Sequence, residues 1–282
     1  SGVYVINLTD TDRPGKIEKF IDIEDKAANG IVNSVPGDPV VINRDSAKGY
    51  VSYGGAIVYV NDLEGKITKI NLTDLFEPNL KLYDHYTLFD VKSTSSDGRL
   101  MYHSMDTAIG KDTKQLWLFA GTGDFNNLTD TTTVGGNVLI GIADEKFPEF
   151  KTPVDVQNFN SGATMVPPTI DNLAKCLDTT KNTVLAPGVN CPKKMPAGIP
   201  SKKGWVIYLD NHKKVTASPT VSGGIAYFPV FSPPITGDKC KNGAATICAI
   251  DDECGTNASS LLGTHAKSDK CLYVGEGILS KI

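Results

Sequence analysis

The chain has 282 residues, of which 40% are hydrophobic and 21% are charged. This composition is typical of a folded protein with a full core and excludes an intrinsically disordered chain. The 28 basic and 32 acidic residues give a formal net charge of -4 with no basic run, so nucleic acid is not expected as a partner. No apolar stretch of membrane-spanning length occurs, and we expect any export signal to have been removed or to lie upstream.

The elements that the sequence predicts are short strands. Before residue 90 they are 3–8, 16–20, 39–42, the two arms of a hairpin over 56–74, and 81–89. The hairpin joins a β-branched strand to an alternating strand through a short acidic turn that ends at Gly65. The alternation over 81–89 predicts a half-solvated outer strand.

The same order of strands recurs further along the chain. The later predicted strands are 100–105, 115–121, 137–144, 204–209, 218–221, 224–231, 246–251 and 271–277. The hairpin ends in Ile70-Asn-Leu-Thr-Asp74, and the same five residues occur at Ile6-Asn-Leu-Thr-Asp10. Acidic turns also follow at Asp144 and Asp251, at growing distances, so the units keep their strands while their loops lengthen.

Repeated antiparallel units with no helical periodicity predict an all-β fold, a β-propeller modified by long loop insertions. A β-sandwich with irregular strands is the alternative. The chain is expected to begin on the third strand of one blade and to end, at 271–277, on the second strand of another. Either the two ends complete one blade of a small ring, or the chain is a fragment of a larger propeller.

All six cysteines lie in the C-terminal part of the chain: Cys176, Cys191, Cys240, Cys248, Cys254 and Cys271. Their spacing matches neither a zinc ribbon nor a CxxC redox pair. The chain is expected to form a single domain over 1–282. Disulfides would cross-link its region 176–282 and would imply an oxidising compartment. Free buried thiols would imply neither. Pairing neighbours in sequence joins Cys176 to Cys191, Cys240 to Cys248 and Cys254 to Cys271, but fifteen connectivities are open.

Several segments, in one order along the chain, resemble segments of the PilC/PilY family of type IV pilus tip adhesins. Residues 58–72 are similar to the family's YAGDLQGNLWRFDL hairpin, 117–125 to FFGTGRYL, 204–209 to GWYIDL, 217–228 to PTVAGGRVYF and 274–281 to GSGIPSR. The matches span roughly 36–282, and together they are far more specific than any one of them.

The resemblance implies that the chain is part of a modified, seven-bladed β-propeller. It also implies an exported protein without enzymatic activity, at the pilus tip or outer cell surface, that supports pilus biogenesis, adhesion and surface sensing. Minor pilins or the pilus tip complex, and a host or surface receptor, are then the expected partners.

The family carries a calcium loop of the form D-x-[DN]-x-D-x-x-x-D directly after its PVV strand. In this chain the corresponding strand is Pro39–Ile42, which places the loop positions on Asn43, Asp45, Ala47 and Val51. One carboxylate and one amide are few for an ion that takes six to eight oxygen ligands. We therefore expect this calcium site to be weak or lost, and no other cofactor is predicted.

A second, weaker metal candidate is the loop that carries Asp124, Asn126 and Asp130, which offers oxygens at alternating positions. Asx turns, in which these side chains bind their own backbone, explain the same pattern. They also explain the pair Asp10 and Asp12.

No catalytic motif is found in the sequence. The four histidines are scattered, and neither an HExxH nor a G-x-S-x-G motif occurs. One alternative function is a quinoprotein-like propeller oxidoreductase, which would stack its cofactor on Trp117 or Trp205. The other is a carbohydrate- or protein-binding propeller unrelated to pili, with Phe125 or Phe231 as a binding aromatic.

Overall fold

The computed structural model describes residues 1–23, 30–43, 55–73, 81–130, 136–150, 169–175, 177–178, 183–184, 204–209, 212–234, 242–256, 258 and 271–280. In these ranges the protein is built from β-strands, with one short 3-10 helix, η2 (Ile170–Asn172). None of the described helical residues forms a segment long and apolar enough to cross a membrane. The fold is all-β, as the sequence predicted.

The first complete sheet is a meander of four antiparallel strands. Its strands, in order, are β3 (Val40–Asn43), β4 (Ala56–Asn61), β5 (Lys66–Asn71) and β6 (His85–Asp90). The predicted hairpin forms the two central strands, and Gly65 takes a φ of 75° in its turn, a conformation that favours glycine. The strand predicted to be an outer one, β6, lies at the edge of this sheet and is half buried.

The second sheet has the order β10-β13-β9-β8-β7. Its strands are β7 (Asp106–Ile109), β8 (Leu116–Gly121), β9 (Val138–Asp144), β13 (Gly204–Tyr208) and β10 (Ala174–Lys175). The strand predicted over 100–105 does not form. Met101 and Met105 are buried there in irregular chain, and the strand begins at Asp106.

The third sheet contains the C-terminal strands. It consists of β14 (Lys214–Val215), β16 (Ile225–Ser232), β17 (Ala244–Asp251) and β18 (Cys271–Glu276), with β15 (Thr220–Ser222) paired to β16. The segment 271–277 was predicted as the second strand of a further blade, and this is wrong. It pairs with β17 along its length and forms the edge of the third sheet.

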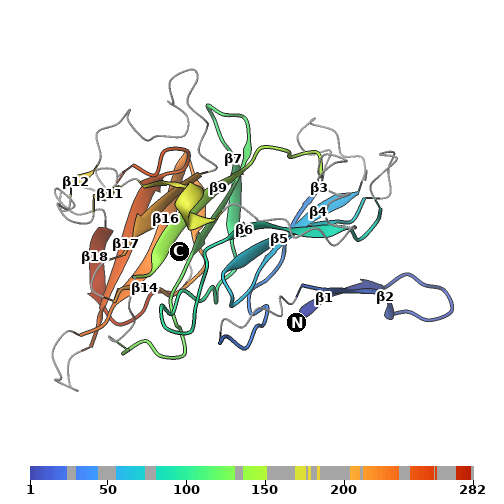
Figure 1. The fold of residues 1–282 in the computed structure, drawn as a ribbon, viewed down its shortest axis with the longest axis horizontal. Helices are drawn as coiled ribbons and strands as arrows, with labels where there is room; N and C mark the ends of the chain where they lie inside the picture. Colours follow the sequence, from blue (N-terminus) through green and yellow to red (C-terminus); the bar gives the residue numbers. More distant parts are fainter. Residues whose placement is uncertain are drawn as a thin grey trace.

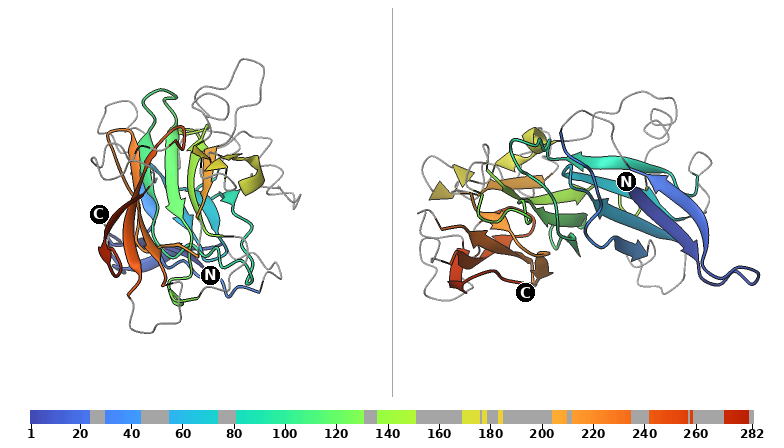
Figure 2. Two further views of the ribbon diagram at one scale, coloured as in Figure 1. Left: turned by 90° about the vertical axis from the view of Figure 1, so that its left-hand side faces the viewer. Right: turned by 90° about the horizontal axis from the view of Figure 1, so that it is seen from below.

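Two small sheets complete the described structure. Strands β1 (Gly2–Asn7) and β2 (Lys16–Asp22) form an antiparallel ribbon, and β11 (Leu177–Asp178) pairs with β12 (Thr183–Val184). In Figure 1 the β1–β2 ribbon and the three larger sheets lie next to one another in chain order, from the ribbon at one end to the third sheet at the other. The right-hand view in Figure 2 shows the same succession of these sheets.

Three hydrophobic cores separate the successive sheets. Along β4, Ile57 and Tyr59 face the core shared with the second sheet, whereas Val58 and Val60 face the core shared with the β1–β2 ribbon. Along β8, Leu118 joins the first of these cores, and Trp117 and Phe119 join a third core against β16 and β17. The central sheets are therefore covered on both faces, as blades of a propeller are, which explains their nearly continuous apolar strands.

The repeated Ile-Asn-Leu-Thr motif forms the same turn in both places. After β1, the Oδ1 atom of Asn7 accepts a hydrogen bond of 3.0 Å from the backbone N–H of Thr9. After β5, Asn71 accepts the corresponding bond from Thr73, also at 3.0 Å. The motif thus ends a strand with an Asx turn, and its recurrence reflects a repeated strand ending.

Candidate functional site

The residues of the predicted calcium loop after β3 are only partly described. Asn43 is the last residue of β3 and pairs with Ala56 of β4, while Asp45, Ala47 and Val51 lie outside the described residues. Within the described ranges, no group of three or more His, Cys, Asp or Glu side chains is arranged to hold a metal ion. The weak calcium site at Asn43 and Asp45 stays a prediction.

The second metal candidate is a compact loop that follows β8. The backbone N–H of Asn126 donates to Oδ1 of Asp124 at 3.0 Å, and the Nδ2 of Asn126 donates to the hydroxyl of Tyr102 at 2.9 Å. Asp130 donates its backbone N–H to the carbonyl of Asn127 at 3.2 Å. The structure therefore brings all three predicted residues onto one loop, with Asp124 in an Asx turn.

This loop surrounds the ammonium group of Lys214, from β14. The Nζ atom donates to the backbone carbonyls of Asn127 at 2.9 Å, Leu128 at 3.1 Å and Asp130 at 2.7 Å. Lys214 has no exposed surface. Burial lowers the pKa of Lys214, while the charges of Asp130 and Asp124 act in the opposite direction.

A second buried lysine joins the first and second sheets. Lys69 in β5 forms an ion pair of 2.6 Å with Asp144 at the end of β9, and both side chains are almost fully buried. Asp144 also accepts a 2.6 Å hydrogen bond from the hydroxyl of Tyr59, and Lys69 donates to the carbonyl of Glu149 at 2.8 Å. Burial, with the neighbouring charge of Asp144, raises the pKa of Tyr59, so this hydroxyl stays protonated as a donor.

The acidic turn of the hairpin is also buried. Asp62 accepts hydrogen bonds from the backbone N–H of Lys66 at 3.0 Å and from the side-chain amide of Asn33 at 3.2 Å. Beside it, Lys66 pairs with Glu64 at 2.8 Å. Burial raises the pKa of Asp62 to about 6, more than these hydrogen bonds lower it.

Both tryptophans are core residues with a fixed hydrogen bond. Trp117 donates its Nε1–H to Thr113 at 3.0 Å, and Trp205 donates to the carbonyl of Asp252 at 2.7 Å. Trp205 lies directly against Gly141, where an added Cβ would clash with the indole ring. Each is at most 1% exposed, so neither is placed to stack on a cofactor.

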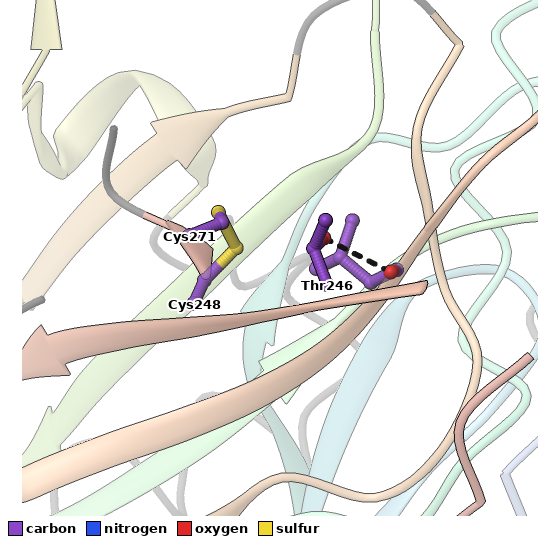
Figure 3. Close-up of a disulfide and its surroundings, with 4 residues drawn as sticks. Thr246, Cys248 and Cys271 are labelled. Atoms are coloured by element: carbon purple, nitrogen blue, oxygen red, sulfur yellow. Dashed lines mark hydrogen bonds between the residues drawn. A yellow bond between two sulfur atoms is a disulfide. The ribbon is translucent and has the colours of Figure 1, made fainter. Parts of the chain in front are cut away.

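One disulfide closes the third sheet. Cys248 of β17 and Cys271 of β18 are bonded to each other (Figure 3). The predicted neighbour pairs of Cys248 with Cys240 and of Cys271 with Cys254 are therefore wrong. The two bonded residues face each other in register across two antiparallel strands, a proximity that sequence spacing does not reveal.

The remaining cysteines are only partly covered by the structure. Cys254 is disulfide-bonded as well, to neither Cys248 nor Cys271. Cys176, Cys191 and Cys240 lie outside the described residues. With 23 residues of separation, the Cys248–Cys271 bond contributes about 3 kcal/mol in the chain-entropy model and ties the edge strand to the sheet.

The two aromatic residues considered as binding residues differ in exposure. Phe231 is 6% exposed and belongs to the buried part of β16. Phe125 is 39% exposed on the loop after β8, and its ring contacts that of His103 edge to face, with centroids 5.0 Å apart. Of these two residues, Phe125 is therefore the one whose ring is exposed to solvent.

The buried lysines are the polar residues that sequence reasoning missed. Lys69 lies two positions after Ile67 on β5, so the strand's alternation already places it on the same inward face. An inward lysine requires an anionic or carbonyl partner, but its partner Asp144 belongs to another sheet. Lys214 gives no such signal, because β14 has only two residues.

Comparison with known proteins supports one assignment. No family model matches the sequence, and no match was found among curated proteins. Among solved structures, the fold is similar to the crystal structure of the Pseudomonas aeruginosa PilY1 C-terminal domain, with a TM-score of 0.57 and 14% sequence identity. The likeness covers 87% of this chain and 52% of that chain, so this chain spans about half the length of the solved one. The protein has a PilY-type fold, a β-propeller-like arrangement of antiparallel sheets.

Proposed function

We propose that this protein acts at the tip of type IV pili or on the outer cell surface, where it supports pilus biogenesis, adhesion and surface sensing. The observation that carries the proposal is the likeness to the PilY1 C-terminal domain over 87% of the chain. At 14% identity this likeness concerns the fold, so the function rests on it together with the ordered sequence segments that resemble the PilC/PilY family.

The proposed location agrees with the cysteine chemistry. A disulfide between Cys248 and Cys271 is stable in the oxidising environment that an exported protein meets. The stacked sheets, joined by buried pairs such as Lys69 with Asp144, provide a rigid support for surface loops. Minor pilins or the pilus tip complex, and a host or surface receptor, are the partners that this role requires. We propose no enzymatic activity.

Deletion of the gene in a piliated strain should reduce the amount of surface pili and the attachment of cells to a surface. The physical reason is that a tip component is needed in every filament. Sheared pili are quantified by immunoblotting for the major pilin, and attached cells are counted after washing. Expression of the wild-type gene from a plasmid should restore both quantities. Normal piliation together with normal attachment in the deletion strain would contradict the proposal.

A propeller that binds carbohydrate or protein without a role in pili is the second function that an observation favours. Phe125 is partly exposed on a loop held by the hydrogen bond from Asn126 to Tyr102, a pre-organised aromatic of the kind that binding surfaces use. Loss of attachment in a Phe125→Ala strain that has normal piliation would assign binding to this ring. A quinoprotein-like activity receives no support from Trp117 or Trp205, which are both buried.

A further inference from the structure

The loop after β8 has the form of a cation-binding loop. Residues 122–130, here called the carbonyl loop, direct the backbone carbonyls of Asn127, Leu128 and Asp130 at one point. Carbonyls that converge in this way present partial negative charge and need a cation or several donors between them. The carboxylates of Asp124 and Asp130 add negative charge to the same region.

The ammonium of Lys214 fills this point completely. It has three N–H donors, and each finds one of the three carbonyls at 2.7–3.1 Å. The approach is close: a Cβ at Gly123 would lie 2.7 Å from the Cβ of Lys214, so a larger residue there would separate the loop from the lysine. The backbone N–H of Val215 donates to the carbonyl of Thr122 at 3.1 Å and fixes the start of the loop beside β14.

The size of the cage distinguishes between ions. Calcium binds oxygen at 2.3–2.6 Å and takes six to eight ligands, whereas three carbonyls converge here, at 2.7–3.1 Å from an ammonium nitrogen. They suit an ammonium group, and carbonyl oxygens also replace the hydration shell of potassium in channel filters. The cage is therefore matched to a monovalent cation of this size.

We propose that the carbonyl loop is a monovalent-cation site whose ion is supplied by the chain itself, the ammonium group of Lys214. The wild-type loop then needs no calcium. If the lysine side chain is shortened, the same carbonyls accept a free ammonium or potassium ion. This assignment does not depend on a role in pili.

The test compares Lys214→Ala with wild type and with Lys213→Ala, which removes the same charge from the neighbouring position. Melting temperatures are measured in choline chloride and in ammonium, potassium or sodium chloride at equal ionic strength, and with calcium chloride or a chelator. Lys214→Ala should melt lower than wild type in choline chloride and should regain at least half of the loss in ammonium or potassium chloride, with a saturating dose dependence. Wild type should melt at the same temperature in all of these salts, and so should Lys213→Ala. Calcium or a chelator should change neither melting temperature.

Equal melting of Lys214→Ala in choline and ammonium chloride would overturn the proposal. So would a larger recovery with calcium than with ammonium, because that would make the loop a divalent site. If Lys214→Ala does not fold, amine acylation of the wild-type protein, with and without chelator, provides the second measurement. Peptide mass mapping should then show Lys214 reacting about tenfold more slowly than Lys213, since reaction requires the loop to open. Similar rates, or protection that is lost on adding the chelator, would overturn the assignment.

Discussion

Replacing Asp144 by alanine should lower the free energy of unfolding by about 3–5 kcal/mol, because it leaves a buried ammonium group without its counter-ion. Lys69 has no exposed surface, so water cannot replace the lost carboxylate, although its hydrogen bond to the carbonyl of Glu149 would stay. The hydroxyl of Tyr59 would lose its acceptor in the same step. Urea unfolding followed by the fluorescence of the two buried tryptophans measures the loss.

The chain offers a matched control for this variant. Asp171 also pairs with a lysine, Lys92, at 3.3 Å, but both side chains are more than half exposed. Asp171→Ala should therefore change stability by less than about 1 kcal/mol. A double variant, Lys69→Met with Asp144→Leu, should recover much of the loss, since neither charge of this buried pair remains. A stability of Asp144→Ala within about 1 kcal/mol of wild type would contradict the view that this pair joins the two sheets.

The strands themselves were largely predictable from the sequence. The predicted hairpin over 56–74 corresponds to β4 and β5, and the segments 115–121 and 137–144 correspond to β8 and β9. These segments are rich in β-branched and aromatic residues and are bounded by Gly or Asx turns, which are local signals. The exception, 100–105, has buried methionines and no strand, because burial alone does not select a backbone conformation.

The pairing of distant strands was not predictable in the same way. The segment 204–209 was predicted as a strand without an assigned partner, and β13 pairs with β9 in the second sheet. The fit of Trp205 over Gly141 illustrates why: pairing depends on side-chain packing between strands that long insertions separate. The Cys248–Cys271 bond and the Lys69–Asp144 pair depend on the same pairings of distant strands. The sequence therefore did not indicate which of these residues contact each other.

The contribution of Asp62 to the stability of the protein should fall as the pH rises from about 4 to about 6. The pKa of this group is about 6 in the folded protein and 3.8 in a model peptide. Over that interval the folded state binds more protons than the unfolded state, so each increase in pH favours unfolding. The shift corresponds to a loss of roughly 2 kcal/mol between pH 4 and pH 7 from this group alone. The stabilisation by Asp62 is fully present at a pH well below its pKa in the unfolded protein. It is lost once the pH exceeds its pKa in the folded protein.

The variant Asp62→Asn isolates this contribution. In the described structure the Oδ1 atom of Asn33 is buried without a hydrogen-bond partner, beside the Nδ2 that donates to Asp62. Rotation of the Asn33 amide would let this Oδ1 accept a hydrogen bond from the amide introduced by the substitution, as it would from protonated Asp62. The stability of Asp62→Asn relative to wild type should therefore rise by roughly 2 kcal/mol between pH 4 and pH 7. Asp12→Asn removes the same charge from an exposed turn and controls for net charge. Urea unfolding at each pH measures the free energy of unfolding of each protein. If this free energy changes with pH in the same way for Asp62→Asn and wild type, a raised pKa of Asp62 is contradicted.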